Sequence, residues 1–183
     1  MNKSLEHYKP LIKLLSFVLL YINSSFSQIP PNFIQYIQSE IPFFIVPDSN
    51  WFNKPDQEIL FSCNLNDNKM QDYVVILIIP ENNKLNAEII ALFDFYSSNK
   101  SIHRVAKIDT EIKEISTGMK IIINGDIKIY NSGYYTKNNG GSELTHEPLE
   151  LKNDAIGYSP HSQYLYIWNS DSSKFIRDYL YLD

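Results

Sequence analysis

The chain has 183 residues and a formal net charge of −5, with 21 Asp and Glu side chains against 16 Lys and Arg. An acidic chain without a cluster of Lys and Arg is a poor candidate for binding nucleic acid or an anionic membrane surface, because both depend on cations that neutralise phosphate. The length fits one domain with a substantial core, and the single cysteine, Cys63, rules out an internal disulfide.

Residues 1–27 are predicted to be a secretory signal peptide. Lysines at positions 3, 9 and 13 precede or enter an apolar run at residues 14–22, and small residues follow it. This nine-residue run is too short to cross a bilayer, although an uncleaved anchor is an alternative. We expect cleavage near Ser27–Gln28 and a secreted or periplasmic chain that does not associate with membrane afterwards.

Residues 28–183 are predicted to form a single α+β domain. Cleavage removes three lysines and one glutamate, which leaves 13 basic and 20 acidic side chains and a formal net charge of −7. A helix is expected over residues 31–39, because Pro31 suits a first helical turn and Pro42 ends the helix. Its apolar residues recur at helical spacing and would pack on one face: Phe33, Ile34, Ile37 and Ile41.

The rest of the domain is predicted to be a predominantly antiparallel β-meander, because short apolar or alternating runs follow one another with turn residues between them. Residues 109–116 permit a helical turn, Asn124-Gly125 favours a two-residue hairpin, and residues 131–150 are interpreted as a long mobile loop. The expected strands are residues 43–46, 59–63, 73–79, 88–95, 102–108, 120–123, 127–130, 155–158, 164–168 and 175–182.

The central stretch, residues 59–80, places a polar loop between two apolar runs. Oxygen-bearing side chains fall at relative positions 1, 3, 5 and 9 of this loop, a spacing that can turn several oxygens toward calcium; they belong to Asn64, Asn66, Asn68 and Asp72. The stretch CNLNDNKMQDYVVIL resembles the D-x-N-x-D-G-x-x-D loop of FG-GAP/VCBS-type repeats in exported bacterial proteins, and residues 154–175 are similar to the ending of small exported proteins with one such loop. In full repeats such loops bind calcium and the fold is a β-propeller, whereas a single loop implies only a strand–loop–strand unit.

Three departures from that pattern argue against calcium. Asn64 and Asn68 stand where the repeats have aspartate, and Lys69 stands where they have glycine. Calcium affinity rises with the charge of the ligands, and here only Asp72 supplies charge. We therefore expect a structural turn without cofactor, in which asparagine side chains bond to the loop's own backbone.

An aromatic row near the C-terminus is the candidate binding surface. Tyr164, Tyr166 and Trp168 alternate along a predicted strand and so share one face. Such a face could hold a sugar ring or a partner protein, since Tyr and Trp combine large contact area with a polar tip. Packing of this face within the fold is the alternative.

No catalytic signature is present: the chain lacks a G-x-S-x-G elbow, a Gly-rich phosphate loop and an H-E-x-x-H motif. Cys63 is interpreted as a small buried residue. The histidines at positions 103, 146 and 161 do not share a metal-ligand spacing.

We therefore expect an exported, non-enzymatic protein that binds a protein or glycan through the aromatic row or the loop at residues 134–150. Two alternatives stay open. One is a glycan- or cell-wall-acting hydrolase that uses a carboxylate pair, and the other is an inhibitor or immunity protein against an enzyme outside the cytoplasm.

Overall fold

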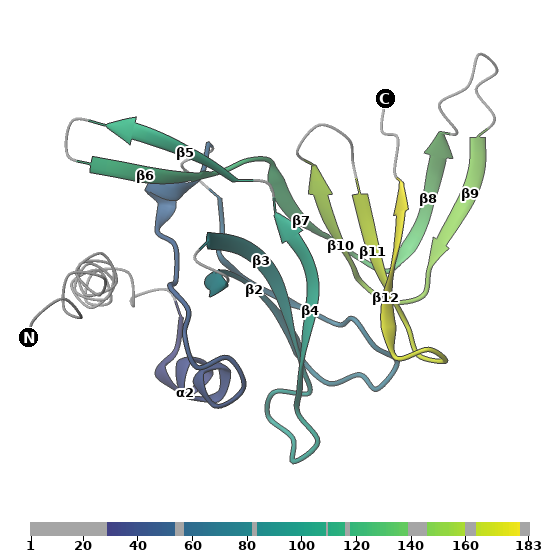
Figure 1. Cartoon of the computed structure of the whole chain (residues 1–183). Helices are drawn as coiled ribbons and strands as arrows, with labels where there is room; N and C mark the ends of the chain where they lie inside the picture. Colours follow the sequence, from purple (N-terminus) through teal and green to yellow (C-terminus); the bar gives the residue numbers. More distant parts are fainter. Residues whose placement is uncertain are drawn as a thin grey trace, which may run out of the picture.

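The part of the chain that the structure describes is mostly antiparallel β-sheet with one short α-helix, which confirms the predicted β-rich fold (Figure 1). The predicted signal peptide lies outside the described residues, and within them no helix is long and apolar enough to cross a membrane. The computed structural model describes residues 29–53, 57–81, 84–108, 110–115, 118–138, 146–159 and 164–179.

The first sheet has four strands in the order β1-β2-β3-β4, each antiparallel to its neighbour. The helix α2, Pro31–Glu40, matches the prediction, and a 3₁₀ turn, Ser49–Trp51, follows it. The strands are β1 (Leu60–Cys63), β2 (Asp72–Glu81), β3 (Lys84–Phe93) and β4 (Ser101–Ile108).

The second sheet also has four antiparallel strands, in the order β12-β11-β10-β7. The turn between β11 and β12 falls between the strands predicted at residues 164–168 and 175–182, and in it the side-chain oxygen of Asn169 accepts a hydrogen bond from the Ser172 N–H (2.8 Å). The strands are β7 (Asp126–Tyr130), β10 (Ala155–Ser159), β11 (Tyr164–Asn169) and β12 (Lys174–Tyr179).

Two hairpins include segments for which the sequence indicated a helical turn and a mobile loop. β5 (Thr110–Ile115) pairs with β6 (Gly118–Ile123), so residues 110–115 form a strand rather than a helical turn. β8 (Gly133–Asn138) pairs with β9 (His146–Leu151), so the predicted loop at 131–150 is largely a hairpin. In both segments, pairing with a second strand outweighs the weak local preference.

The predicted hairpin at Asn124-Gly125 is also wrong. Gly125 has a positive φ of 90°, as the turn prediction requires. The strands on either side of it, however, do not pair with each other. β6 pairs with β5, whereas β7 joins β10 in the second sheet. The predicted strand at residues 43–46 is reduced to one bridge between Ile45 and Ile78.

The core has two layers because the first sheet is buried on both faces. Residues 74–79 of β2 are all buried, and α2 covers one face through Phe33, which is 1% exposed. The Phe33 ring stacks on Phe95 and meets Tyr73 edge-on, with centroids 3.8 Å and 4.6 Å away. The second sheet packs against the other face through Phe93 and Trp168.

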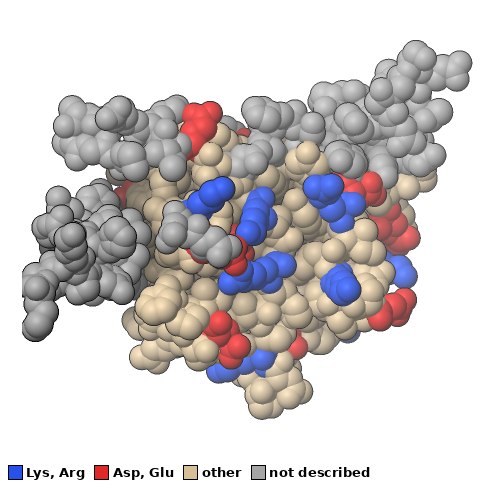
Figure 2. Space-filling view, in the orientation of Figure 1, with Lys and Arg blue, Asp and Glu red and all other residues tan. Residues whose placement is uncertain are grey.

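The surface seen in Figure 2 mixes Lys and Arg with Asp and Glu side chains rather than gathering one sign of charge. One such group lies on β2, β3 and β4, where Glu81 pairs with Lys107 (2.8 Å) and Arg104 (3.6 Å). The Arg104 guanidinium also lies 3.7 Å from the carboxylate of the buried Glu88. Glu81, Lys107 and Arg104 therefore balance one another's charge at the surface, and Arg104 also lies beside the buried Glu88.

Candidate functional site

The loop between β1 and β2 is closed by its own hydrogen bonds. The Asn66 side-chain oxygen accepts from the Asn68 backbone N–H (3.2 Å), and the Asn68 oxygen accepts from the Met70 N–H (2.8 Å). The amide nitrogens of Asn66 and Asn68 donate to the Asp94 carboxylate. Two of the side-chain oxygens at the candidate ligand positions thus accept hydrogen bonds from the loop backbone.

Asp72 lies at the base of this loop and is fully buried. One carboxylate oxygen accepts the Leu65 N–H (2.8 Å) and the other accepts the Asp94 N–H (2.9 Å). Burial raises the pKa of Asp72, while the hydrogen bonds from Asp94 and Leu65 act in the opposite direction. Within the described residues, no group of three or more His, Cys, Asp or Glu side chains is placed to hold a metal.

Asn64, the remaining candidate ligand, ties the loop to the second sheet. Its N–H donates to the Asp154 carboxylate (2.8 Å), and its carbonyl accepts the Asp154 N–H (2.8 Å). The same carboxylate accepts the Ser132 N–H at 2.9 Å. Asn66, Asn68 and Asp72 therefore brace the loop and its neighbouring strands through their side chains. Asn64 joins the loop to the second sheet through its backbone, and its buried side-chain oxygen has no hydrogen-bond partner among the described residues.

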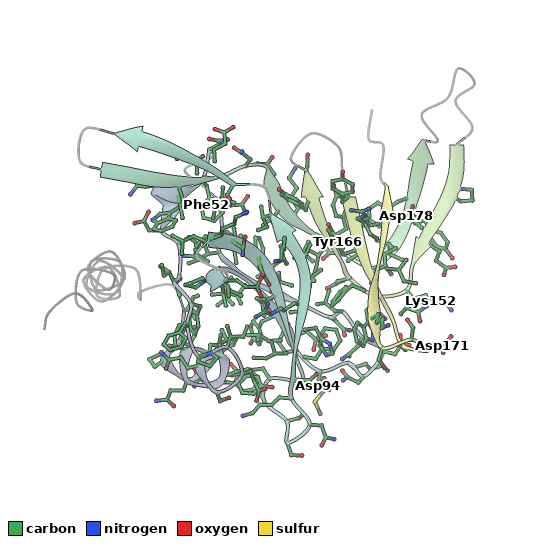
Figure 3. All side chains as sticks on the ribbon, in the orientation of Figure 1. Phe52, Asp94, Lys152, Tyr166, Asp171 and Asp178 are labelled. Atoms are coloured by element: carbon green, nitrogen blue, oxygen red, sulfur yellow. The ribbon has the colours of Figure 1, made fainter. Side chains whose placement is uncertain are left out.

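The aromatic row faces the interior. Tyr166 is 7% exposed, and Tyr164 and Trp168 are partly buried against the same core. The Trp168 ring lies 4.6 Å from that of Phe93 and 4.8 Å from that of His103, centroid to centroid. Figure 3 shows Tyr166 in the second sheet and Asp94 just after β3 of the first sheet. The row forms part of the packing between the sheets rather than an open platform.

Cys63 is buried at the end of β1. Burial raises the pKa of its thiol well above the ordinary range, and the nearby Asp72 and Asp154 charges add to the effect. Since the thiolate is the reactive form, we expect no reaction with a thiol reagent such as DTNB in the native protein and full reaction after unfolding in guanidinium. Rapid native labelling would contradict this burial.

His103 is half-buried beside Trp168, and burial lowers its pKa. The unfolded chain therefore binds a proton more readily than the native protein, and this residue's contribution to stability should fall as the pH drops below about 6.5. We expect the urea midpoint to fall less steeply between pH 7.5 and pH 5 in His103→Gln than in the wild type. If the urea midpoint depends on pH equally in both proteins, His103 does not cause the loss of stability at low pH.

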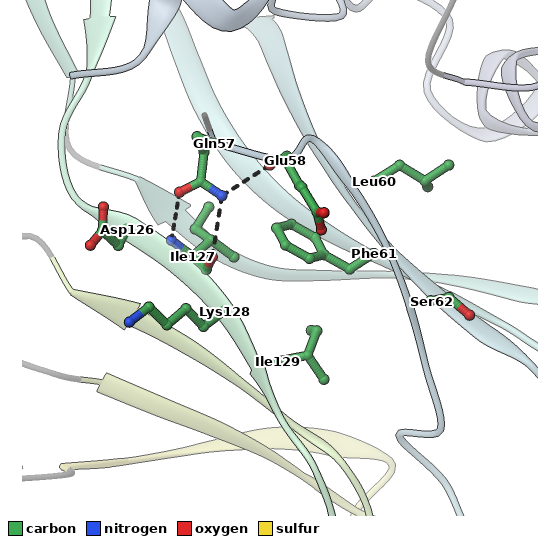
Figure 4. A pocket seen from close by; sticks show the side chains of 9 residues that line it. All are labelled: Gln57, Glu58, Leu60, Phe61, Ser62, Asp126, Ile127, Lys128 and Ile129. Atoms are coloured by element: carbon green, nitrogen blue, oxygen red, sulfur yellow. Dashed lines mark hydrogen bonds between the residues drawn. The ribbon is translucent and has the colours of Figure 1, made fainter. Parts of the chain in front are cut away.

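A groove of about 750 Å³ lies between β1 and β7, the adjoining edges of the two sheets (Figure 4). In the described part of the chain, β1 pairs only with β2, and β7 pairs only with β10. Figure 4 shows the Phe61 ring pointing across the groove toward β7, and Lys128 pointing away from β1. The lining residues are Gln57, Glu58, Leu60, Phe61, Ser62, Asp126, Ile127, Lys128 and Ile129.

Gln57 closes one end of this groove through its side-chain amide. The amide oxygen accepts the Ile127 N–H (3.1 Å), and the amide nitrogen donates to the carbonyls of Ile127 (3.2 Å) and Glu58 (3.0 Å). Beyond the other end, the Asn64–Asp154 contacts join the residue that follows β1 to the residue that precedes β10. The groove therefore has strand edges along its sides and a polar brace near each end, Gln57–Ile127 at one and Asn64–Asp154 at the other. We call the space between these two braces the window.

A second hollow, of about 660 Å³, lies between α2 and the turn after β3. The Lys100 ammonium sits 4.7 Å from the centre of the Tyr36 ring, and Tyr96 is 71% exposed. The aromatic rings, amides and hydroxyls that line this second hollow suit a polar ligand such as a sugar. The lining residues are Asn32, Gln35, Tyr36, Ser39, Phe95, Tyr96, Ser97 and Lys100.

The sequence did not predict the groove because its two walls are separated by about 70 residues along the chain. The prediction paired residues 127–130 with residues 120–123, which left no free edge there. The alternating Ile127, Lys128 and Ile129 were a signal for a strand, but they carried no signal for its partner.

A comparison of the chain with protein-family models, curated proteins and solved structures found no match.

Proposed function

We propose that the protein is an exported, non-enzymatic binding protein that holds a segment of a partner protein in the groove between β1 and β7. The observation that carries the proposal is that both walls are edge strands in the described structure, and they border an open volume of about 750 Å³. Edge strands carry backbone donors and acceptors that proteins normally cover. An inhibitor or immunity protein is a narrower form of this function.

The composition of the groove supports a polypeptide partner. Apolar side chains at Phe61, Ile127 and Ile129 lie beside backbone polar groups, a combination that suits a peptide better than a sugar or a phosphate. The mixed charge of the face in Figure 2 also favours a protein over nucleic acid.

The test is panning of a displayed library of random twelve-residue peptides on the purified protein and on Ile129→Trp, which fills the groove. The matched control is Ile176→Trp, because Ile176 lies in the same sheet and is 50% exposed. We expect the enriched peptides to bind wild type and Ile176→Trp equally, and Ile129→Trp at least about tenfold more weakly. Equal binding by all three proteins, or no enrichment, would overturn the proposal.

The hydrolase alternative has one specific observation in its favour, since Glu58 and Asp126 both line the groove. Incubation of the protein with purified peptidoglycan and with the enriched peptides, followed by mass spectrometry of the products, separates the two functions. Intact peptidoglycan and intact peptides support binding alone. Cleavage that Glu58→Gln or Asp126→Asn abolishes would replace the binding function with an enzymatic one.

A further inference from the structure

The backbone groups of both groove walls point into the space between them. Just before β1, the Ile59 carbonyl accepts a hydrogen bond from the Ile76 N–H in β2 (3.1 Å). Because inward and outward groups alternate along an antiparallel pair, the N–H and C=O groups of Leu60 and Ser62 face away from β2. In β7, Ile127 bonds to Gln57 rather than β10, so Ile129, two residues on, faces the groove as well.

Gln57 already places one peptide-like group between the two walls. A carboxamide has the same donor and acceptor atoms as a backbone peptide unit. Here its nitrogen bridges the carbonyls of Glu58 on one wall and Ile127 on the other, while its oxygen takes the Ile127 N–H. At this end, the walls are therefore separated by the space that one peptide group fills.

The two walls run in the same direction. Gln57, before β1, meets Ile127 at the start of β7. Asn64, after β1, meets Asp154, whose carboxylate also binds Ser132 just after β7. A single segment could therefore run antiparallel to both walls. The stretch between the two braces has room for about four residues at roughly 3.3 Å per residue.

We infer that the partner segment, which rests on the proposed function, enters this window as an extended β-strand that pairs with β1 on one side and β7 on the other. The strand would continue both four-stranded sheets and close the gap between them. Its alternate side chains would face the interior beside Phe61 and Ile129 and should be apolar, while those between them face solvent.

The first test uses the best peptide from the library and copies of it with one backbone amide methylated at a time. A strand inserted between two edges donates hydrogen bonds alternately to either side, so methylation of any of its four central residues should weaken binding about tenfold. A strand on one edge alone would tolerate methylation at every second residue. That alternating tolerance, or tolerance throughout, would overturn the inference while the proposed function stands.

The second test acts on the protein. Ser62→Pro removes an N–H that faces the groove and leaves the β2 pairing intact, and Ser62→Ala is its matched control. Proline is accepted on edge strands where its missing N–H faces outward, so both variants should fold. We expect Ser62→Pro to bind the peptide about tenfold more weakly and Ser62→Ala to bind it like wild type. Equal affinity of the two variants would contradict strand pairing.

Amide hydrogen exchange adds an independent readout on the unmodified protein. The amides of Leu60, Ser62 and Ile129 should exchange rapidly in the free protein and become at least about tenfold slower with saturating peptide. Peptide binding without protection of these amides would mean that the groove is occupied by side chains only, which overturns the inference. Failure to enrich any peptide overturns both this inference and the proposed function.

Discussion

Replacing Asp72 with alanine is expected to lower the free energy of unfolding by roughly 3 kcal/mol and the melting temperature by about 10 °C. The carboxylate is fully buried and accepts the backbone N–H groups of Leu65 and Asp94. Alanine leaves both donors without an acceptor, and each unsatisfied buried donor costs about 1–3 kcal/mol. Urea unfolding followed by tryptophan fluorescence measures the loss.

Asp67→Ala is the matched control for this loss. Asp67 belongs to the same loop and its side chain is exposed, with one surface hydrogen bond from Asn153 (2.9 Å). Its replacement should cost less than about 1 kcal/mol. Asp72→Asn should fall between the two variants, because its amide oxygen can replace only one of the two acceptors.

The same experiment with millimolar calcium and then with a chelator decides what Asp72 does. A structural carboxylate gives the same loss in both conditions, whereas a calcium ligand gives a loss that appears only with calcium. We expect the same loss, because the side-chain oxygens of Asn66 and Asn68 bond to the loop backbone. A wild-type melting temperature that rises by several degrees with calcium would instead restore the loop as a cation site.

The sequence predicted those elements whose local pattern agrees with their final partners. Pro31 and the apolar spacing of Phe33, Ile34 and Ile37 marked α2 almost to its last residue. The strong β-propensity of residues 73–79 marked β2, and its central position follows because a strand that is apolar on both faces must be covered on both.

The failures share one physical cause, which is that strand pairing is non-local. Asn124-Gly125 has the turn chemistry of a hairpin, and Gly125 does adopt a positive φ. The strands beside it nevertheless pair with β5 and β10, so the turn joins two sheets instead of two neighbours. Nothing within a few residues of Gly125 distinguishes these outcomes, because each strand's register depends on residues far along the chain.

The groove could not be predicted from the sequence for the same reason. Its walls depend on two edges that exist only once both sheets have formed, and its braces join Gln57 to Ile127 and Asn64 to Asp154. The aromatic row shows the converse case. Alternation correctly placed Tyr164, Tyr166 and Trp168 on one strand face, but only the packing against Phe93 and His103 reveals that this face is covered.

The second large effect is expected from Phe33→Ala, which should lower the free energy of unfolding by about 3–5 kcal/mol. Phe33 is 1% exposed and its ring fills the space between Phe95 and Tyr73. Removing it leaves a cavity that the backbones of β2 and α2 can close only in part. Urea unfolding followed by circular dichroism measures the change, with Gln35→Ala on the exposed side of the same helix as the control.

In Phe33→Ala, we expect α2 to detach and unfold before the sheets do. α2 has ten residues, and a helix of that length is marginal in water without tertiary packing. Loss of Phe33 should therefore release the helix from the first sheet, so that amide exchange in α2 accelerates far more than in β2. If exchange instead rises equally in both elements, the helix and the sheet unfold as one unit, and Phe33 stabilises the whole core rather than the attachment of α2.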